Sequence, residues 1–197
     1  MGGLLYAITK LKVKTIIIGR QYKSCHNYEK FIEIAKEKKI NIKIVESGDR
    51  INIEKNVYVD VLWPYKNNII YENSINNNSL VCKIVYKNFS ILCTGDIEKI
   101  AEKAILSKYK ENLDILKSDV LKVAHHGSKT SSTLEFLNAV EPKYAIIGVG
   151  ENNKFGHPSN NTIQNLKMKD VEIYRTDEMG EIVITTDGKK VKIKKFK

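Results

Sequence analysis

The stretch LKVAHHGSKTSS, from Leu121 to Ser132, decides how this sequence is interpreted. Apolar residues that favour a strand over 120–124 run directly into two adjacent histidines, His125 and His126, which a Gly-Ser turn follows. Adjacent residues on an extended chain point to opposite sides, so one imidazole can face a metal ion while the other packs or supports it. The sequence leaves open which histidine is the ligand. We expect His125, because it ends the strand.

A second stretch, SILCTGD, ends another apolar strand at Thr94-Gly95-Asp96. Gly95 allows a sharp turn, after which Asp96 projects from the carboxyl end of the sheet, where many α/β proteins bind ligands. The alternative is that Asp96 only caps the helix that we expect to begin at Ile97.

A third stretch, NKFGHPSNNT over 153–162, places His157 in a polar loop before a helix that Ser159 caps. This histidine could contact substrate, donate a proton or lie on the surface without a role. The fourth histidine, His26, lies near a helix start, and we assign it no function.

Strands and helices alternate along the whole chain, which predicts an α/β protein with sheets covered by helices. The polar segment 65–78 is expected to be a loop. The expected helices are 2–10, 28–38, 97–108, 133–140 and one that starts at Ser159. The expected strands are 14–19, 42–45, 57–63, 80–86, 89–93, 120–124, 144–149, 171–174, 181–186 and 190–194.

Composition limits the class of protein. The 197 residues, 42% of them hydrophobic, suit one domain over 1–197 with a real core. No run of apolar residues is long enough to span a bilayer and the start is not a signal peptide, so we expect a soluble, cytoplasmic chain. The cysteines Cys25, Cys82 and Cys93 form no CxxC pair and are expected to be reduced thiols. The formal net charge of +10 favours a polyanion partner, but only weakly.

A carboxylate and imidazoles at separate strand ends suit zinc or manganese, and such an ion can activate water. A serine triad is the rival chemistry. Ser128 lies too close to His126 in sequence to form a standard nucleophile–base pair, and the chain has no G-x-S-x-G elbow. Gly148-Val149-Gly150 lacks the rest of a dinucleotide-binding pattern.

These motifs, in this order, resemble one branch of the metallo-β-lactamase superfamily. Four stretches carry the resemblance: SLVCKIVYKNFSILCTGDIE, DVLKVAHHGSKTSS, PKYAIIGVGENNKFGHP and RTDEMGEI. The branch is the ComEC type, which comprises the C-terminal domain of bacterial DNA-uptake channel proteins and its free-standing relatives. The match runs from Gly2 to about Thr186.

The resemblance implies a four-layer αββα sandwich with two divalent metal ions, zinc or manganese, and a DNA phosphodiester substrate cleaved by a metal-bound hydroxide. Asp96 corresponds to the metal-bridging aspartate and His125 or His126 to the late metal-binding histidine. His157 corresponds to a residue at the mouth of the site, with a catalytic role. We also expect substrate contacts from Asn78, Ser79, Ser128 and Lys129.

One departure from the family pattern matters most. The family's main ligand motif, His-x-His-x-Asp-His, comes just before a Gly-Gly, which here is Gly2-Gly3. We therefore expect that motif and the first strands of the fold to lie before Met1. The remaining ligands would bind metal weakly or partially. An upstream segment or a partner chain would complete the site, unless the chain is an inactive remnant.

Three functions remain open from the sequence. The first is a metal-dependent hydrolase of nucleic acid that is incomplete in this chain. The second is an inactive remnant or DNA-binding module of the same fold. The third is a hydrolase of another phosphoester or of a small acyl substrate.

Overall fold

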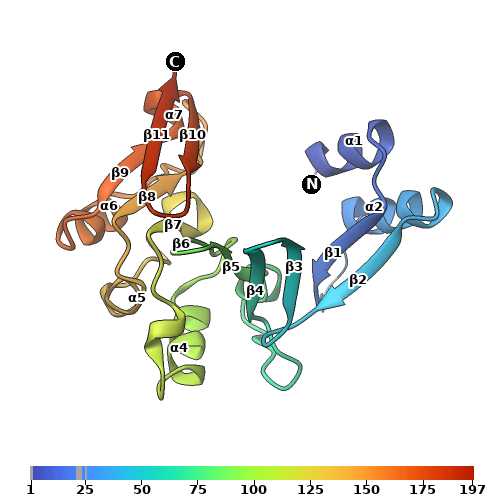
Figure 1. Cartoon of the computed structure of the whole chain (residues 1–197), viewed down its shortest axis with the longest axis horizontal. Coiled ribbons are helices and arrows are strands. Elements are labelled where there is room, and N and C mark those ends of the chain that lie inside the picture. Colours follow the sequence, from blue (N-terminus) through green and yellow to red (C-terminus); the bar gives the residue numbers. More distant parts are fainter. Residues whose placement is uncertain (1, 21–23, 25) are drawn as a thin grey trace.

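The structure, a computed structural model, describes residues 2–20, 24 and 26–197 (Figure 1). It is a mixed α/β protein with one large sheet of seven strands and two smaller two-stranded sheets. The α/β class is thereby confirmed, whereas the four-layer sandwich is not.

The seven-stranded sheet has the strand order β3-β4-β5-β6-β7-β8-β9. Its strands are β3 (Arg50–Glu54), β4 (Val57–Trp63), β5 (Val81–Tyr86), β6 (Phe89–Cys93), β7 (Val120–Lys122), β8 (Tyr144–Ile147) and β9 (Glu172–Arg175). Neighbours from β3 to β6 pair antiparallel, and neighbours from β6 to β9 pair parallel. The carboxyl ends of β6 to β9 therefore meet at one edge of the sheet, where ligand sites of open α/β sheets are found.

Three helices cover one face of this sheet: α4 (Lys99–Lys108), α5 (Leu134–Val140) and α6 (Asn160–Lys167) (Figure 1). Leu92, Leu121 and Ala145 pair across β6, β7 and β8 and are fully buried beneath them. Apolar burial of this extent is the main force that holds the parallel strands, and the edge that they share, in place. The helix residues that pack on them include Ala101, Ile105, Phe136, Leu137 and Leu166.

The opposite face of the sheet is only partly covered. Side chains alternate between faces along a strand, so the row Cys82, Cys93, Lys122, Ile146 and Tyr174 lies on this second face, and all five are half-buried. A hairpin of β10 (Glu181–Thr186) and β11 (Val191–Phe196) reaches the β5–β6 turn, where the Asn88 amide donates to the Gly188 carbonyl at 3.3 Å.

The N-terminal part has a small core of its own. It contains α1 (Gly2–Lys10), α2 (His26–Glu37) and the parallel pair β1 (Thr15–Gly19) and β2 (Asn41–Val45). Figure 1 shows this part beside β3, away from the helices that cover the large sheet. Its buried residues are Ile8, Ile16, Phe31, Ala35 and Ile40.

Most expected elements are present, with boundaries that agree or differ by one or two residues. The strand expected over 120–124 ends at Lys122, because the chain leaves the extended conformation at Ala124. Two short helices, α3 (Ser74–Asn77) and α7 (Thr176–Met179), and the strand β3 were not expected, and α3 lies inside the predicted loop 65–78. None of the helices in the described part of the chain has both the length and the apolar character needed to cross a bilayer.

Candidate active site at the carboxyl ends of β6 and β7

Asp96 and the two adjacent histidines lie together at the edge where β6 and β7 end. The His125 amide donates to the Gly95 carbonyl at 3.1 Å, and the Thr94 hydroxyl donates to the Lys122 carbonyl at 2.7 Å. These two bonds tie the loop after β6 to the end of β7 and to the loop that follows it. The two motifs, which the sequence places at separate strand ends, therefore lie at one edge of the sheet.

Gly95 turns the chain so that Asp96 faces this edge. Its φ is +57°, and a Cβ at this position would lie 2.7 Å from the Cβ of Ser79, so only glycine fits. The Asp96 amide then donates to the Ser79 hydroxyl at 3.3 Å. The alternative role for Asp96 as helix cap is wrong, because α4 begins at Lys99 and Glu98 holds the N-cap position.

The two histidines are not on extended chain. Both have left-handed backbone conformations, with φ of +49° at His125 and +56° at His126. The expectation that they point to opposite sides of a strand is therefore wrong in its geometry, since the strand has already ended. Gly127 follows with φ +82°, and a Cβ there would lie 2.6 Å from the Cβ of Pro158. This turn thus needs glycine where it packs against the His157 loop.

His126 is the histidine that faces Asp96. Its Nε2 lies 3.9 Å from Asp96 Oδ1, while its Nδ1 lies 2.6 Å from the carbonyl oxygen of Gly148. A carbonyl can only accept a hydrogen bond, so Nδ1 carries the proton and donates it. In the neutral ring, Nε2 then presents a lone pair toward a carboxylate. That arrangement is favourable when a cation or a proton lies between the two atoms.

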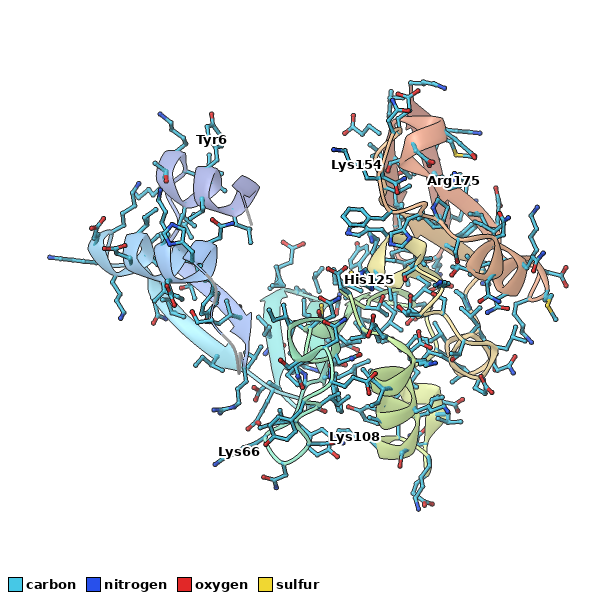
Figure 2. The ribbon with its side chains drawn as sticks, turned by 180° about the vertical axis from the view of Figure 1, so that it is seen from behind. Tyr6, Lys66, Lys108, His125, Lys154 and Arg175 are labelled. Atoms are coloured by element: carbon cyan, nitrogen blue, oxygen red, sulfur yellow. The ribbon has the colours of Figure 1, made fainter. Side chains whose placement is uncertain are left out.

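His125 lies behind this pair. Its Nδ1 is buried without a hydrogen-bond partner and lies 3.7 Å from Glu98 Oε1. Its ring meets the ring of His157 edge-on, with centroids 5.7 Å apart. Figure 2 shows His125 in the C-terminal half of the structure, on the side that carries Lys154.

Glu98 joins three segments of the site, and it was not among the site residues that the sequence predicted. Its carboxylate accepts from the Thr130 hydroxyl at 3.0 Å and from the Asn77 side-chain amide at 3.3 Å. The Glu98 amide in turn donates to Asn77 Oδ1 at 3.0 Å. A second carboxylate two residues after Asp96 was the available signal for this residue.

Glu102 holds the loop that follows the histidines. Its buried carboxylate accepts from the amides of Ser132 and Thr133 and from the Thr133 hydroxyl. Burial raises the pKa of Glu102, and these hydrogen bonds oppose that rise. The carboxylate thereby fixes the loop between the metal-ligand candidates and α5.

His157 lies across from His125 on a tightly bonded loop. Its amide donates to Asn153 Oδ1 at 2.9 Å, and its carbonyl accepts from Asn153 Nδ2 at 2.7 Å. Burial, and then the proximity of His125 and His126, lower the pKa of His157. The neutral imidazole is therefore favoured over the charged form more than in a free histidine.

The four residues expected to contact substrate differ in accessibility. Asn78 is 1% exposed, and its amide bonds the backbone of Ile70 and Ser74. Ser79 accepts from the Asp96 amide, as described above. Ser128 is 5% exposed and bonds Thr130. Lys129 is exposed, so it is the member of this set that is free to reach a ligand.

The side chains at this edge include two that could donate to a metal ion. Asp96 and His126 offer one oxygen and one nitrogen donor, and 46% and 52% of their side-chain surfaces are exposed. Zinc and manganese accept both donor types, and tight zinc sites take three or four protein ligands. Among residues 2–20, 24 and 26–197, no group of three or more His, Cys, Asp and Glu side chains is arranged to hold a metal ion. The described residues therefore offer two facing donors, fewer than a tight zinc site takes.

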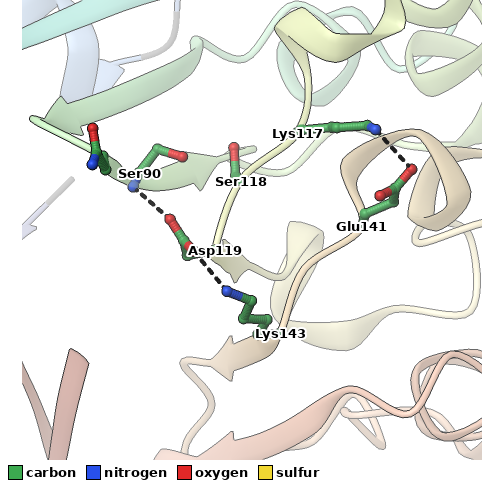
Figure 3. A pocket seen from close by; sticks show the side chains of 7 residues that line it. Ser90, Lys117, Ser118, Asp119, Glu141 and Lys143 are labelled. Atoms are coloured by element: carbon green, nitrogen blue, oxygen red, sulfur yellow. Dashed lines mark hydrogen bonds and ion pairs between the residues drawn. The ribbon is translucent and has the colours of Figure 1, made fainter. Parts of the chain in front are cut away.

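A separate pocket lies at the other end of the strands, beside the start of β7 (Figure 3). Its charged groups pair with one another: Lys117 with Glu141 at 3.3 Å, and Lys143 with Asp119 at 3.4 Å. Asp119 also accepts from the Ser90 amide at 3.0 Å. These contacts join β6, β7 and β8 and leave little charge unpaired for a ligand.

Sequence comparison places the chain among competence proteins. It is 36% identical over 171 residues to ComE operon protein 3 of Bacillus subtilis (strain 168), a match that covers 87% of this chain and 21% of that protein. It is 36% identical over 107 residues to competence protein ComA of Neisseria gonorrhoeae, covering 54% of this chain and 15% of that protein. It is 29% identical over 126 residues to recombination protein 2 of Haemophilus influenzae, covering 64% of this chain and 15% of that protein.

The chain thus spans about a fifth or less of the length of these relatives. No family model matches it. The alignment with the first relative covers most of the chain, and the motifs at the carboxyl ends of β6 and β7 are among those that carry the family resemblance. By sequence, this chain belongs to the ComEC-type competence proteins, as the homologue of one part of them.

Proposed function

We propose that the chain carries part of a metal-dependent hydrolase site that cleaves nucleic-acid phosphodiesters in a DNA-uptake role. One observation supports this most: Asp96 and His126 come from the ends of two neighbouring strands and face each other at 3.9 Å. The names of two relatives, ComE operon protein 3 and competence protein ComA, supply the biological context.

In this proposal Asp96 and His126 would hold a divalent ion. Such an ion, when bound, lowers the pKa of a water ligand and neutralises charge on a phosphate oxygen. The Gly148 carbonyl keeps the His126 proton on Nδ1, so Nε2 remains free as a donor atom. His157, whose pKa is lowered by burial and by the nearby His125 and His126, would contact the substrate.

Further ligands would come from an upstream segment or a partner chain that also completes a four-layer sandwich. The half-buried second face of the large sheet supports this part of the proposal. So do apolar side chains that remain exposed in the N-terminal part, namely Leu4 at 55%, Leu11 at 64% and Ile44 at 54%. Exposed apolar surface of this kind marks a place where another part of a protein packs.

The net charge supports a polyanionic substrate. A formal charge of +10 raises the local concentration of DNA near the chain, and Lys129 lies exposed three residues after His126. A DNA-binding module without catalysis is the second candidate. It is favoured by the presence of only two facing donors among the described residues.

The genomic DNA before the Met1 codon gives the first test. An in-frame stretch that encodes His-x-His-x-Asp-His supports a longer, active enzyme, whereas stop codons in every frame without such a stretch would contradict the proposal for this gene.

A cleavage assay gives the second test. For a protein that includes the upstream motif, we expect Mn²⁺- or Zn²⁺-dependent cleavage of linear DNA, which a chelator and Asp96→Ala both abolish. For the 197-residue chain we expect little cleavage. Cleavage that persists in Asp96→Ala would contradict the site assignment. DNA binding without cleavage by the longer protein would support the second candidate.

A further inference from the structure

Phe155 is an exposed aromatic side chain beside the candidate site. It lies in the loop between β8 and α6, and 81% of its surface is accessible. It follows Lys154, which is also exposed and which Figure 2 shows on the same side as His125. Single exposed apolar side chains are common on protein surfaces, so the exposure of Phe155 matters here because of its place beside the site residues.

The loop holds Phe155 in one place. The Asn153 side chain makes four hydrogen bonds within it. Its Nδ2 donates to the carbonyls of Gly150 (3.2 Å) and His157 (2.7 Å), and its Oδ1 accepts from the amides of Phe155 (3.3 Å) and His157 (2.9 Å). A ring presented by a bonded loop loses less freedom on binding than one on a flexible loop, so the loop is preorganised.

Phe155 also continues a series of rings that starts in the site. Its ring is nearly parallel to that of His157, with centroids 5.9 Å apart and planes inclined by 19°. His157 in turn meets His125 edge-on. One face of Phe155 is directed toward His157, and the high exposure leaves the other face open.

We propose that the open face of Phe155 stacks on an unpaired nucleobase of a nucleic acid whose backbone enters the candidate site. This inference rests on the proposed function and narrows its substrate to single-stranded or end-frayed nucleic acid. A base inside a duplex is stacked on its neighbours and offers no free face to a protein ring. An unpaired base does offer one, and aromatic rings next to basic side chains are the usual platform for it.

The test is equilibrium binding of a fluorescent oligothymidylate, compared with an abasic oligonucleotide of equal length, without metal ions. We expect Phe155→Ala to weaken binding of the oligothymidylate by about 5- to 100-fold, the effect of losing one base stack, and to leave binding of the abasic strand unchanged. Tyr71→Ala is the matched control, because Tyr71 is equally exposed at 81% but lies in the 65–78 loop.

A second variant gives an independent readout. The chain has one tryptophan, Trp63, which is fully buried, so Phe155→Trp adds a single exposed reporter. We expect the oligothymidylate to quench its emission and the abasic strand not to do so.

Three results would overturn the inference: no binding of either strand by the wild-type chain, equal weakening on both strands, or an unchanged affinity for oligothymidylate in Phe155→Ala. The assay measures binding and involves no cleavage, so it can be interpreted even if the chain belongs to no hydrolase. Conversely, normal cleavage activity together with equal effects on oligothymidylate and the abasic strand would reject base stacking and leave the hydrolase proposal in place.

Discussion

The imidazole of His126 bridges two strand ends: its Nδ1 donates to the Gly148 carbonyl at 2.6 Å, and its Nε2 lies 3.9 Å from Asp96 Oδ1. One contact fixes the tautomer and the ring orientation, and the other leaves a donor atom next to a carboxylate. His125, our expected ligand, has its Nδ1 directed instead toward Glu98. This geometry favours His126 as the metal ligand in the proposed site.

Gly127 should be essential for the turn that carries the histidines. Gly127→Ala places a Cβ 2.6 Å from the Cβ of Pro158 and imposes a side chain at φ +82°. We expect the free energy of unfolding to fall by about 2–4 kcal/mol, the combined cost of left-handed strain and overpacking. Urea denaturation measures this change.

Gly150→Ala is the control for that variant, because a Cβ there meets no atom within 4 Å. An equal loss of stability in the two variants would mean that neither the close approach to Pro158 nor the backbone strain decides the effect.

Glu102 should stabilise the loop after the histidines. Glu102→Gln replaces one acceptor oxygen by an NH₂ group, so at least one of the buried donors of Ser132 and Thr133 loses its partner. We expect a loss of about 1–3 kcal/mol in the free energy of unfolding, again by urea denaturation. Glu135→Gln, on the exposed side of α5, should change it little. Equal stability of wild type and Glu102→Gln would show that the Glu102 hydrogen bonds do not stabilise this loop.

Cys93 should be the more reactive thiol of the pair that faces across β5 and β6. A hydrogen bond from Cys82 and the nearby Lys122 ammonium lower the pKa of Cys93 to about 7, whereas the same hydrogen bond and burial raise the pKa of Cys82. The thiolate of Cys93 therefore accumulates as the pH rises through about 7, so alkylation by iodoacetamide should increase over that range.

Peptide mass spectrometry after alkylation separates the cysteines. Lys122→Met should move the midpoint for Cys93 upward, while Lys83→Met, from the opposite face of β5, should not. Faster alkylation of Cys82 than of Cys93 at pH 7 would contradict the assignment of the thiolate.

The sequence predicted the strands that carry the site because they are continuous apolar runs. The apolar residues of IVYKNFSILC and VLKVA are typical of buried strands, and Gly95 indicated the turn before Asp96. β3 was missed because its residues are mostly polar and exposed, as expected of an edge strand with little buried surface.

The details of the site were less predictable, for physical reasons. The left-handed backbone at His125 and His126 is uncommon for residues other than glycine, and no residue type announces it. The Gly148 carbonyl that orients His126 is a backbone group from the loop after β8, and backbone acceptors have no signature in sequence. Residue type thus identified the candidates, and packing determined which of them face each other. Two residues named in these expectations lie outside the described residues: Cys25, expected to be a reduced thiol, and Met1, expected to follow the family's ligand motif.

Direct measurement of Mn²⁺ binding by the 197-residue chain, with free Mn²⁺ counted by electron paramagnetic resonance, tests the pairing of Asp96 with His126. We expect weak binding to the wild-type chain that both Asp96→Ala and His126→Ala weaken by at least about tenfold and that His125→Ala leaves unchanged. No binding by the wild type, or loss of binding in His125→Ala with none in His126→Ala, would contradict the assignment of His126 and Asp96 as the two ligands.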